Sequence, residues 1–181
     1  KGMGLFLGSA GCVLETFFDT PKSIDIHRLL MRMANRLGPR VNNYVHAILG
    51  SPVAWPITTH AHLVDPYYAS REDFQPYLDH LQAIDTRLFL EMVCQAHSHD
   101  AFPWLHEVQA PTLIVAAEND RFTPMHVSER MLKCLPSSEL MVLADASHAA
   151  IIEQPRTINH RLERFFQEWN LAATSDSPPA S

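Results

Sequence analysis

Three short apolar runs along the chain predict strands, and segments with apolar residues every three or four positions predict helices. The runs lie within Gly4–Gly8, Pro111–Ala117 and Ser137–Ala144. A continuous apolar run such as Gly4–Gly8 is typical of a strand that is buried on both faces of a parallel sheet. Strands that alternate with helices form βαβ units, which have parallel strands and right-handed crossovers. The pattern therefore predicts an α/β fold with three parallel strands and flanking helices.

Helical periodicity dominates the segment between the first and second runs. One helix is expected to end at Gly38 and a second at Gly50, because glycine is favoured just after a helix. Ser70 and Asp85 are the expected N-caps of two further helices. The proline-rich stretch 51–66 is expected to contain loops and at most one short helix.

Two more helices are predicted after the second strand. The apolar positions expected to face inward are Met125, Val127, Met131, Leu132 and Leu135 in the first, and Ile158, Leu162, Phe165 and Phe166 in the terminal one. The last residues, 171–181, have no apolar anchors and are expected to be disordered.

Composition narrows the class of protein. The chain has 181 residues, of which 46% are hydrophobic and 19% charged, and its formal net charge is −6. The acidic balance argues against a nucleic-acid surface and a basic membrane anchor, and no apolar run approaches the ~20 residues that cross a bilayer. Cys12, Cys94 and Cys134 are far apart and form no Cys-x-x-Cys pair. This spacing favours a reducing, cytoplasmic location.

Two ionisable residues follow the second and third strands. Asp120 lies in "VAAENDRFTP", and His148 lies in "ADASHAAIIEQP". Ligands of open parallel sheets bind beyond the carboxyl ends of the strands, so both side chains are expected at one edge. A histidine that acts as a general base needs a carboxylate on its far ring nitrogen. The two residues are therefore the candidate catalytic acid and base; Asp145 is the alternative acid, more typical of a turn residue.

These segments resemble the acid and histidine loops of α/β-hydrolase-fold enzymes. The matching positions are Glu118, Asp120, Pro124, His148, Glu153 and Pro155, while Ala117 stands where the family has a glycine. "GLFLGSAG" resembles the sixth strand of that family. The resemblance extends to about Trp169 and implies a partial α/β-hydrolase fold. Residues 1–23 and 105–170 would be the C-terminal part of the core, and residues 24–104 an inserted helical lid.

The nucleophile of that family has no counterpart in the sequence. It is a serine or an aspartate in a Gly-x-Ser-x-Gly-like turn upstream of the sixth strand. In "GSAG" the serine, Ser9, is in the wrong register, and "LGSPVAW" continues with proline instead of a helix start. Because Lys1 lies directly before the sixth strand, we expect the C-terminal portion of a longer hydrolase. Such a chain would supply the acid and the histidine and would be inactive alone.

The resemblance implies hydrolysis of an ester or similar acyl bond in a small to medium apolar substrate, without a cofactor. The same fold also carries dehalogenases, epoxide hydrolases, cofactor-free haloperoxidases and carbon–carbon bond hydrolases, and these alternatives stay open. Met125 and Ala149 adjoin the two loops and are candidate walls of the substrate pocket. Phe17 and Trp55 are further candidates, for which packing of the lid is an equally good explanation.

Two other functions are worth weighing. "HAH" at 60–62 and "HSHD" at 97–100 bring metal-binding residue types together, but histidines two apart on a helix point to different faces, so no metal site is expected. A non-catalytic interaction module is the alternative from a different class. The first strand would then be an unpaired apolar edge that invites self-association, and Asp120 and His148 would be dispensable.

Overall fold

A three-stranded parallel sheet forms the centre of the computed structural model, which describes residues 1–20 and 22–170. Its strands are β1 (Met3–Phe6), β2 (Thr112–Ala117) and β3 (Ser138–Leu143), in the order β1-β2-β3. Thr112 pairs with Met3 on one side and with Ser138 on the other. The predicted α/β class and its three parallel strands are confirmed. The tail expected to be disordered, 171–181, lies outside the described residues.

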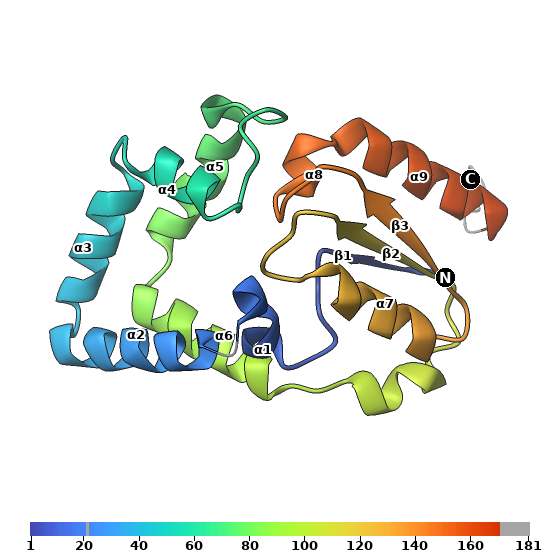
Figure 1. Ribbon diagram of the computed structural model, residues 1–181, viewed down its shortest axis with the longest axis horizontal. Helices are drawn as coiled ribbons and strands as arrows, with labels where there is room; N and C mark the ends of the chain where they lie inside the picture. The colour runs from blue at the N-terminus through green and yellow to red at the C-terminus, as the bar shows by residue number, and fades with distance from the viewer. Residues whose placement is uncertain (21, 171–181) are drawn as a thin grey trace, which may run out of the picture.

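Within residues 1–20 and 22–170, eight helical segments connect β1 to β2 and three follow β2. The first group is α1 (Val13–Thr16), the 3₁₀ helix η1 (Phe17–Asp19), α2 (Ser23–Leu37), α3 (Arg40–Leu49), α4 (Ala54–His60), α5 (Arg71–Ala83), α6 (Thr86–Ser98) and the 3₁₀ helix η2 (Phe102–Glu107). The second group is α7 (Met125–Cys134), α8 (Ala150–Glu153) and α9 (Pro155–Glu168). Helices α2–α6, called here the helical insertion, lie beyond the carboxyl ends of the strands (Figure 1). In the part of the chain described, every helix is too short or too polar to cross a bilayer.

Local sequence signals set the ends of the insertion helices as predicted. Gly38 ends α2 with a positive φ of 56°, a conformation that costs other residues free energy. Ser70 caps α5 in a reciprocal capping box with Asp73. Asp85 caps α6 by accepting a hydrogen bond of 2.9 Å from the backbone N–H of Leu88. The single short helix expected within 51–66 is α4.

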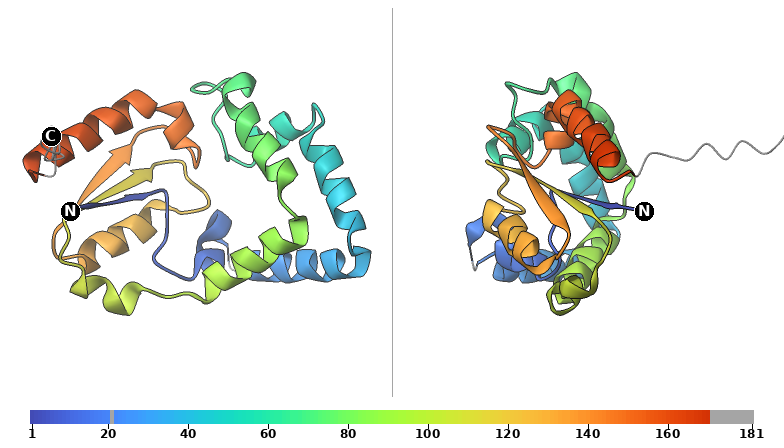
Figure 2. Two further views of the ribbon diagram at one scale, coloured as in Figure 1. Left: turned by 180° about the vertical axis from the view of Figure 1, so that it is seen from behind. Right: turned by 90° about the vertical axis from the view of Figure 1, so that its right-hand side faces the viewer.

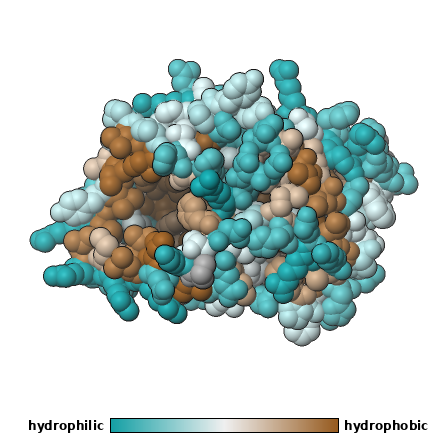
Figure 3. Space-filling view, viewed as in Figure 1, coloured by the Kyte–Doolittle hydropathy of each residue, from teal (hydrophilic) through white to brown (hydrophobic). Residues whose placement is uncertain are grey.

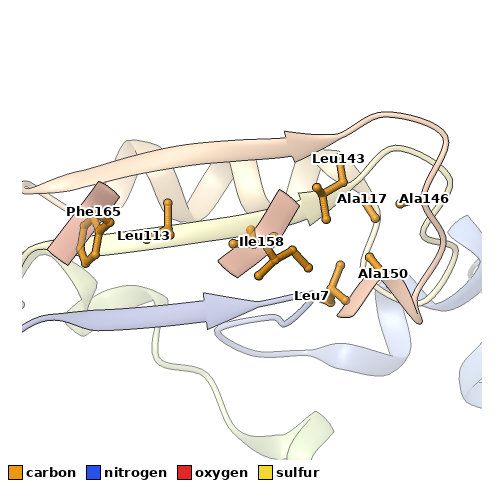
Figure 4. Close-up of a cluster of buried hydrophobic side chains, with 9 residues drawn as sticks. Leu7, Leu113, Ala117, Leu143, Ala146, Ala150, Ile158 and Phe165 are labelled. Carbon is orange, nitrogen blue, oxygen red and sulfur yellow. The ribbon is translucent and has the colours of Figure 1, made fainter. Parts of the chain in front are cut away.

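Helices cover both faces of β2, which is buried along its whole length. Leu113 faces α9 and contacts the cluster that includes Ile158 and Phe165 (Figure 4). Its neighbour Ile114 points to the opposite face and packs with Met131 of α7. The side view in Figure 2 shows α7 and α9 on opposite sides of the sheet. This packing holds the end of β2, and the loop that follows it, in a fixed place.

Two of the sequence predictions about burial were wrong. β1 is not buried on both faces: Gly4 is exposed, and within the described residues β1 pairs with β2 alone. Phe166 was expected to face inward but is 40% exposed, whereas Phe165 is buried. Three apolar side chains of α6, those of Leu88, Phe89 and Met92, are also exposed. Periodicity identifies the side chains that share a face, but burial depends on the elements that pack against that face.

Candidate active site

The loops after β2 and β3 lie side by side at the edge of the sheet that faces the helical insertion. Backbone hydrogen bonds connect them: the N–H of Glu118 donates to Leu143 at 3.0 Å, and the N–H of Asn119 donates to Ala146 at 2.9 Å. The carboxylate of Glu118 also accepts from the backbone N–H of Asp145 at 3.2 Å. The two loops therefore form one rigid platform.

Asp120 and His148 meet on this platform. The distance from Asp120 Oδ2 to His148 Nδ1 is 2.9 Å. The same Oδ2 accepts from the hydroxyl of Thr123 at 2.7 Å, while Oδ1 accepts from the N–H groups of Phe122 and Thr123 at 2.8 and 2.9 Å. Asp120 is 4% exposed, so these donors take the place of water around its carboxylate. The acid is held by its own turn and does not cap α7, whose N-cap is Pro124.

The environment keeps Asp120 ionised. Burial by itself would raise the pKa of this carboxyl. The hydrogen bond and the charge of His148, together with the hydrogen bonds from Thr123, outweigh burial and hold the pKa of Asp120 below its ordinary value. The site thus provides a carboxylate that can orient an imidazole and stabilise its protonated form.

Acidification should therefore destabilise the fold through Asp120. Its folded-state pKa lies below the value of about 3.9 for an unperturbed aspartate, so in that range the unfolded chain binds more protons. The stability that ionised Asp120 contributes is present above about pH 4 and lost as the pH falls through the folded-state pKa. Urea unfolding measured from about pH 6 to pH 3 should show a steeper loss of stability for the wild type than for Asp120→Asn. Parallel pH profiles for the two proteins would contradict this explanation.

His148 combines a fixed orientation with access to solvent. Its side chain is 30% exposed, and its ring packs against that of Phe122 with centroids 4.9 Å apart. Nδ1 faces a carboxylate, so this nitrogen carries the proton in the neutral ring and Nε2 has the free lone pair. Among the described residues, Asp120 is the one hydrogen-bond partner of the ring. Nε2 is therefore the atom that can accept a proton from a reacting group.

Glu153 connects the histidine loop to the helical insertion. Its carboxylate is buried and accepts from the backbone N–H of Ser147 at 2.8 Å and from that of Asp65 at 2.7 Å. The hydroxyl of Ser147 lies within hydrogen-bonding distance of both Glu153 and the carbonyl of Leu63. Ser147 is thus part of this connection, and the contacts of Glu153 are structural ones between the two segments.

Within the described residues, neither of the other polar candidates forms a hydrogen bond with the imidazole. Asp145 is exposed at the turn before His148, with a φ of 57°. The hydroxyl of Ser9 donates to the carbonyl of Gly11, in its own loop, at 2.6 Å. No group of three metal-ligating side chains occurs within residues 1–20 and 22–170, and the paired histidines of "HAH" and "HSHD" gain no third ligand there.

Two cavities flank the acid loop. An acidic cavity of about 570 Å³ is lined by Asp120 itself and by Met125, one of the predicted pocket residues. An apolar cavity of about 280 Å³ lies within the helical insertion, and Phe122 forms part of its wall. The space-filling view shows the surface hollowed over the insertion, with hydrophobic residues around the hollow (Figure 3). Side chains that line the apolar cavity include Val45, Leu49, Leu63, Leu81, Ile84 and Phe89.

The remaining predicted pocket residues pack on other side chains. Phe17 contacts the ring of Phe122, with centroids 5.3 Å apart. Trp55 packs against Phe74, with centroids 6.2 Å apart, in the core of the insertion. Ala149 contacts the same core from the histidine loop. Their contribution to substrate binding stays a prediction.

Sequence reasoning missed Phe122 and Thr123. Thr123 lies three residues after Asp120, a spacing at which a hydroxyl can bond back to a turn aspartate, so its pattern could have been recognised. Phe122 has no comparable signal, because its importance arises from the ring of His148, which is 26 positions further along the chain.

Comparison with known proteins gives the family context. A family model described as TAP-like protein, one of the α/β-hydrolase models, matches residues 83–177. A 2-hydroxy-6-oxononadienedioate/2-hydroxy-6-oxononatrienedioate hydrolase from Pseudomonas putida is 43% identical over 63 residues, which are 35% of this chain and 22% of that protein. Its counterpart from Klebsiella pneumoniae is 41% identical over 66 residues, or 36% of this chain and 23% of that protein.

Solved structures resemble the fold over most of the described chain. A hydrolase from Pseudomonas aeruginosa superposes with a TM-score of 0.64 at 15% identity, over 92% of this chain and 55% of that one. A thermophilic esterase from Thermogutta terrifontis gives a TM-score of 0.62 at 17% identity, over 92% of this chain and 56% of that one. The chain thus spans just over half the length of these structures and less than a quarter of the curated relatives.

Proposed function

Because the chain belongs to the α/β-hydrolase family, we propose that Asp120 and His148 are the acid and the general base of a catalytic triad. The observation that carries this proposal is the 2.9 Å contact between Asp120 Oδ2 and His148 Nδ1 at the carboxyl edge of the sheet. Burial of the acid and partial exposure of the histidine support the same roles. The reaction proposed is hydrolysis of a carboxylic ester or a similar acyl bond.

In this mechanism Nε2 of His148 takes the proton of a nucleophile as that nucleophile attacks the acyl carbon. Asp120 holds the ring in the required tautomer and stabilises the imidazolium that forms. His148 then gives the proton to the leaving alcohol, whose bond to the acyl carbon breaks. In the second half of the reaction, His148 takes a proton from the water that attacks the acyl-enzyme and returns it to the nucleophile.

The nucleophile is proposed to come from a segment upstream of β1 in a longer polypeptide. Gly-x-Ser-x-Gly is absent from the sequence. The hydroxyl of Ser9 donates to the carbonyl of Gly11, and the hydroxyl of Ser147 donates to the carboxylate of Glu153. This chain covers 56% and 55% of two of the superposed hydrolase structures, which leaves room for such a segment.

Carbon–carbon bond hydrolysis is the second candidate. It is favoured by the 43% identity over 63 residues to a 2-hydroxy-6-oxononadienedioate hydrolase. That substrate is a dicarboxylate, whereas the apolar cavity has no charged side chain among its lining residues. Ester hydrolysis of an uncharged substrate therefore agrees better with the cavity.

Active-site labelling tests the proposed function. The 181-residue chain alone is expected to show no turnover of p-nitrophenyl butyrate and no covalent labelling by a fluorophosphonate, because its sequence contains no Gly-x-Ser-x-Gly motif. A polypeptide extended by its upstream coding sequence is expected to show both. Stoichiometric labelling of Ser9 or Ser147 in the shorter chain would mean that the nucleophile has been misplaced. An upstream sequence without a serine or aspartate turn would favour the interaction module.

A further inference from the structure

Helix α2 presents four large apolar side chains to solvent. Exposed fractions between 44% and 56% are found for Ile26, Leu29, Leu30 and Met33. Positions i, i+3, i+4 and i+7 of a helix lie on one face, so these side chains form one stripe, called here the α2 stripe. Within the described residues, none of the four belongs to a buried hydrophobic cluster or lines the apolar cavity of the insertion. A contiguous exposed apolar patch is typical of an interaction site.

Another side of α2 fixes the helix to the rest of the insertion. His27 and Ala34 are buried, and Nε2 of His27 lies 2.9 Å from the backbone carbonyl oxygen of Leu90 in α6. Figure 1 shows α2 along the border of the molecule, and the view from behind in Figure 2 shows it there too. The α2 stripe therefore lies on a helix that is held in place and that a flat surface can reach.

Basic residues gather around the α2 stripe. The segment from Lys22 to Arg40 contains five of the chain's 14 Lys and Arg residues but only one of its 20 Asp and Glu residues. Both end residues are exposed, the first just before α2 and the second at the start of α3. The net charge of −6, which by itself argues against a basic membrane anchor, thus conceals a local excess of positive charge.

Three arginines form a row along one side of the stripe. Arg28, Arg32 and Arg36 are exposed and follow one another at a spacing of four, which places them on neighbouring turns of one helix face. Arg36 lies three positions after Met33, so the row borders the stripe. Arg28 pairs with Asp25 at 3.1 Å, whereas the other two arginines form no salt bridge within residues 1–20 and 22–170. Their charges are available to a partner.

An anionic lipid surface matches both features at once. It offers phosphate and carboxylate headgroups to the arginine row and acyl chains to the apolar stripe, whereas a nucleic acid offers the charges alone. A symmetric contact with a second copy would bring two positive rows together. From these observations we propose that α2 binds the interface of an anionic membrane, with its stripe at the level where headgroups meet acyl chains. This peripheral contact requires neither a membrane span nor the proposed hydrolase function.

Vesicle binding of the full 181-residue chain tests the proposal. Co-sedimentation compares vesicles of phosphatidylcholine alone with vesicles that contain about 30% phosphatidylserine. The chain is expected to bind the mixed vesicles about tenfold or more tightly than the neutral ones. Most of this difference should disappear when the salt concentration rises from about 0.1 M to about 0.5 M. Arg32→Gln combined with Arg36→Gln should weaken binding to the mixed vesicles about twentyfold, because each basic residue at the surface contributes about fivefold.

A second pair of variants separates the stripe from the charges. Leu29→Ser combined with Met33→Ser should weaken binding to the mixed vesicles about tenfold, because less apolar area leaves water. The matched control is Arg71→Gln combined with Arg156→Gln, which removes the same charge from exposed positions of α5 and α9. Its binding should stay within about twofold of the wild type, because distant charges are screened. Circular dichroism of each variant checks that the fold is retained.

Equal binding to the two kinds of vesicle, or an equal loss in the two arginine pairs, would overturn the proposal. So would unchanged vesicle binding in the serine pair. If that pair lost self-association in sedimentation equilibrium but still bound vesicles as the wild type does, the stripe would be a contact between copies. Loss of vesicle binding in the upstream-extended polypeptide would mean that the added segment covers the stripe. None of these measurements uses esterase activity, so a failure of the proposed function is seen separately.

Discussion

Replacing His148 with alanine in the upstream-extended enzyme is expected to reduce kcat by several orders of magnitude. Without the imidazole, the nucleophile loses the base that removes its proton and the acid that protonates the leaving alcohol. In a comparable hydrolase, removing the triad histidine lowers kcat on the order of 10⁶-fold. The remaining rate comes from substrate binding and the oxyanion site. Initial rates with p-nitrophenyl butyrate over a range of concentrations separate kcat from KM, which should change little.

His160→Ala is the control for this experiment. His160 is exposed on α9, away from the sheet edge that holds the two loops, so the variant should retain wild-type rates. If His148→Ala kept a substantial fraction of kcat while His160→Ala behaved as the wild type, His148 would not be the base.

Replacing Asp120 with asparagine is the second change with a large expected effect. The amide can still accept the hydrogen bonds from Phe122 and Thr123, so the turn should survive. It cannot stabilise an imidazolium, and its NH₂ group can hold the imidazole in the wrong tautomer. In a serine protease the equivalent change lowers kcat about 10⁴-fold, and we expect a loss of that order.

Asp145→Asn distinguishes the two candidate acids. Asp145 is exposed, and its backbone N–H donates to the carboxylate of Glu118, a hydrogen bond that asparagine preserves. Asparagine also tolerates the positive φ of 57° at this position. Activity should therefore stay within about twofold of the wild type. If Asp145→Asn lost most of its activity while Asp120→Asn stayed nearly as active as the wild type, Asp145 would have to be assigned as the acid.

Local patterns in the sequence were sufficient for the strands, the helix caps and the pairing of the two loops. Ser70 and Asp85 act on N–H groups only three residues away, so their capping can be recognised from the sequence. The meeting of Asp120 and His148 follows from a general property of parallel sheets, that the ends of neighbouring strands share one edge. These features depend on few or no details of side-chain packing.

Features that depend on packing between distant segments could not be predicted. The wall of the apolar cavity combines α3, α5 and α6 with Phe122, and none of these segments indicates a cavity by itself. The wrong expectation for Phe166 has the same origin, because α9 packs on the sheet through one narrow stripe that includes Ile158 and Phe165.

The buried carboxylate of Glu153 limits how such an enzyme can exchange parts with its relatives. It accepts hydrogen bonds both from Asp65, within the α4–α5 connection of the helical insertion, and from Ser147 beside the histidine. A chimaera that imports the insertion of another hydrolase would leave this carboxylate without its partner on the far side unless the segment around Leu63 and Asp65 is matched. The insertion should therefore be exchanged between relatives together with the histidine loop. These two segments form one structural unit, although 84 positions separate Leu63 from Ser147 in the sequence.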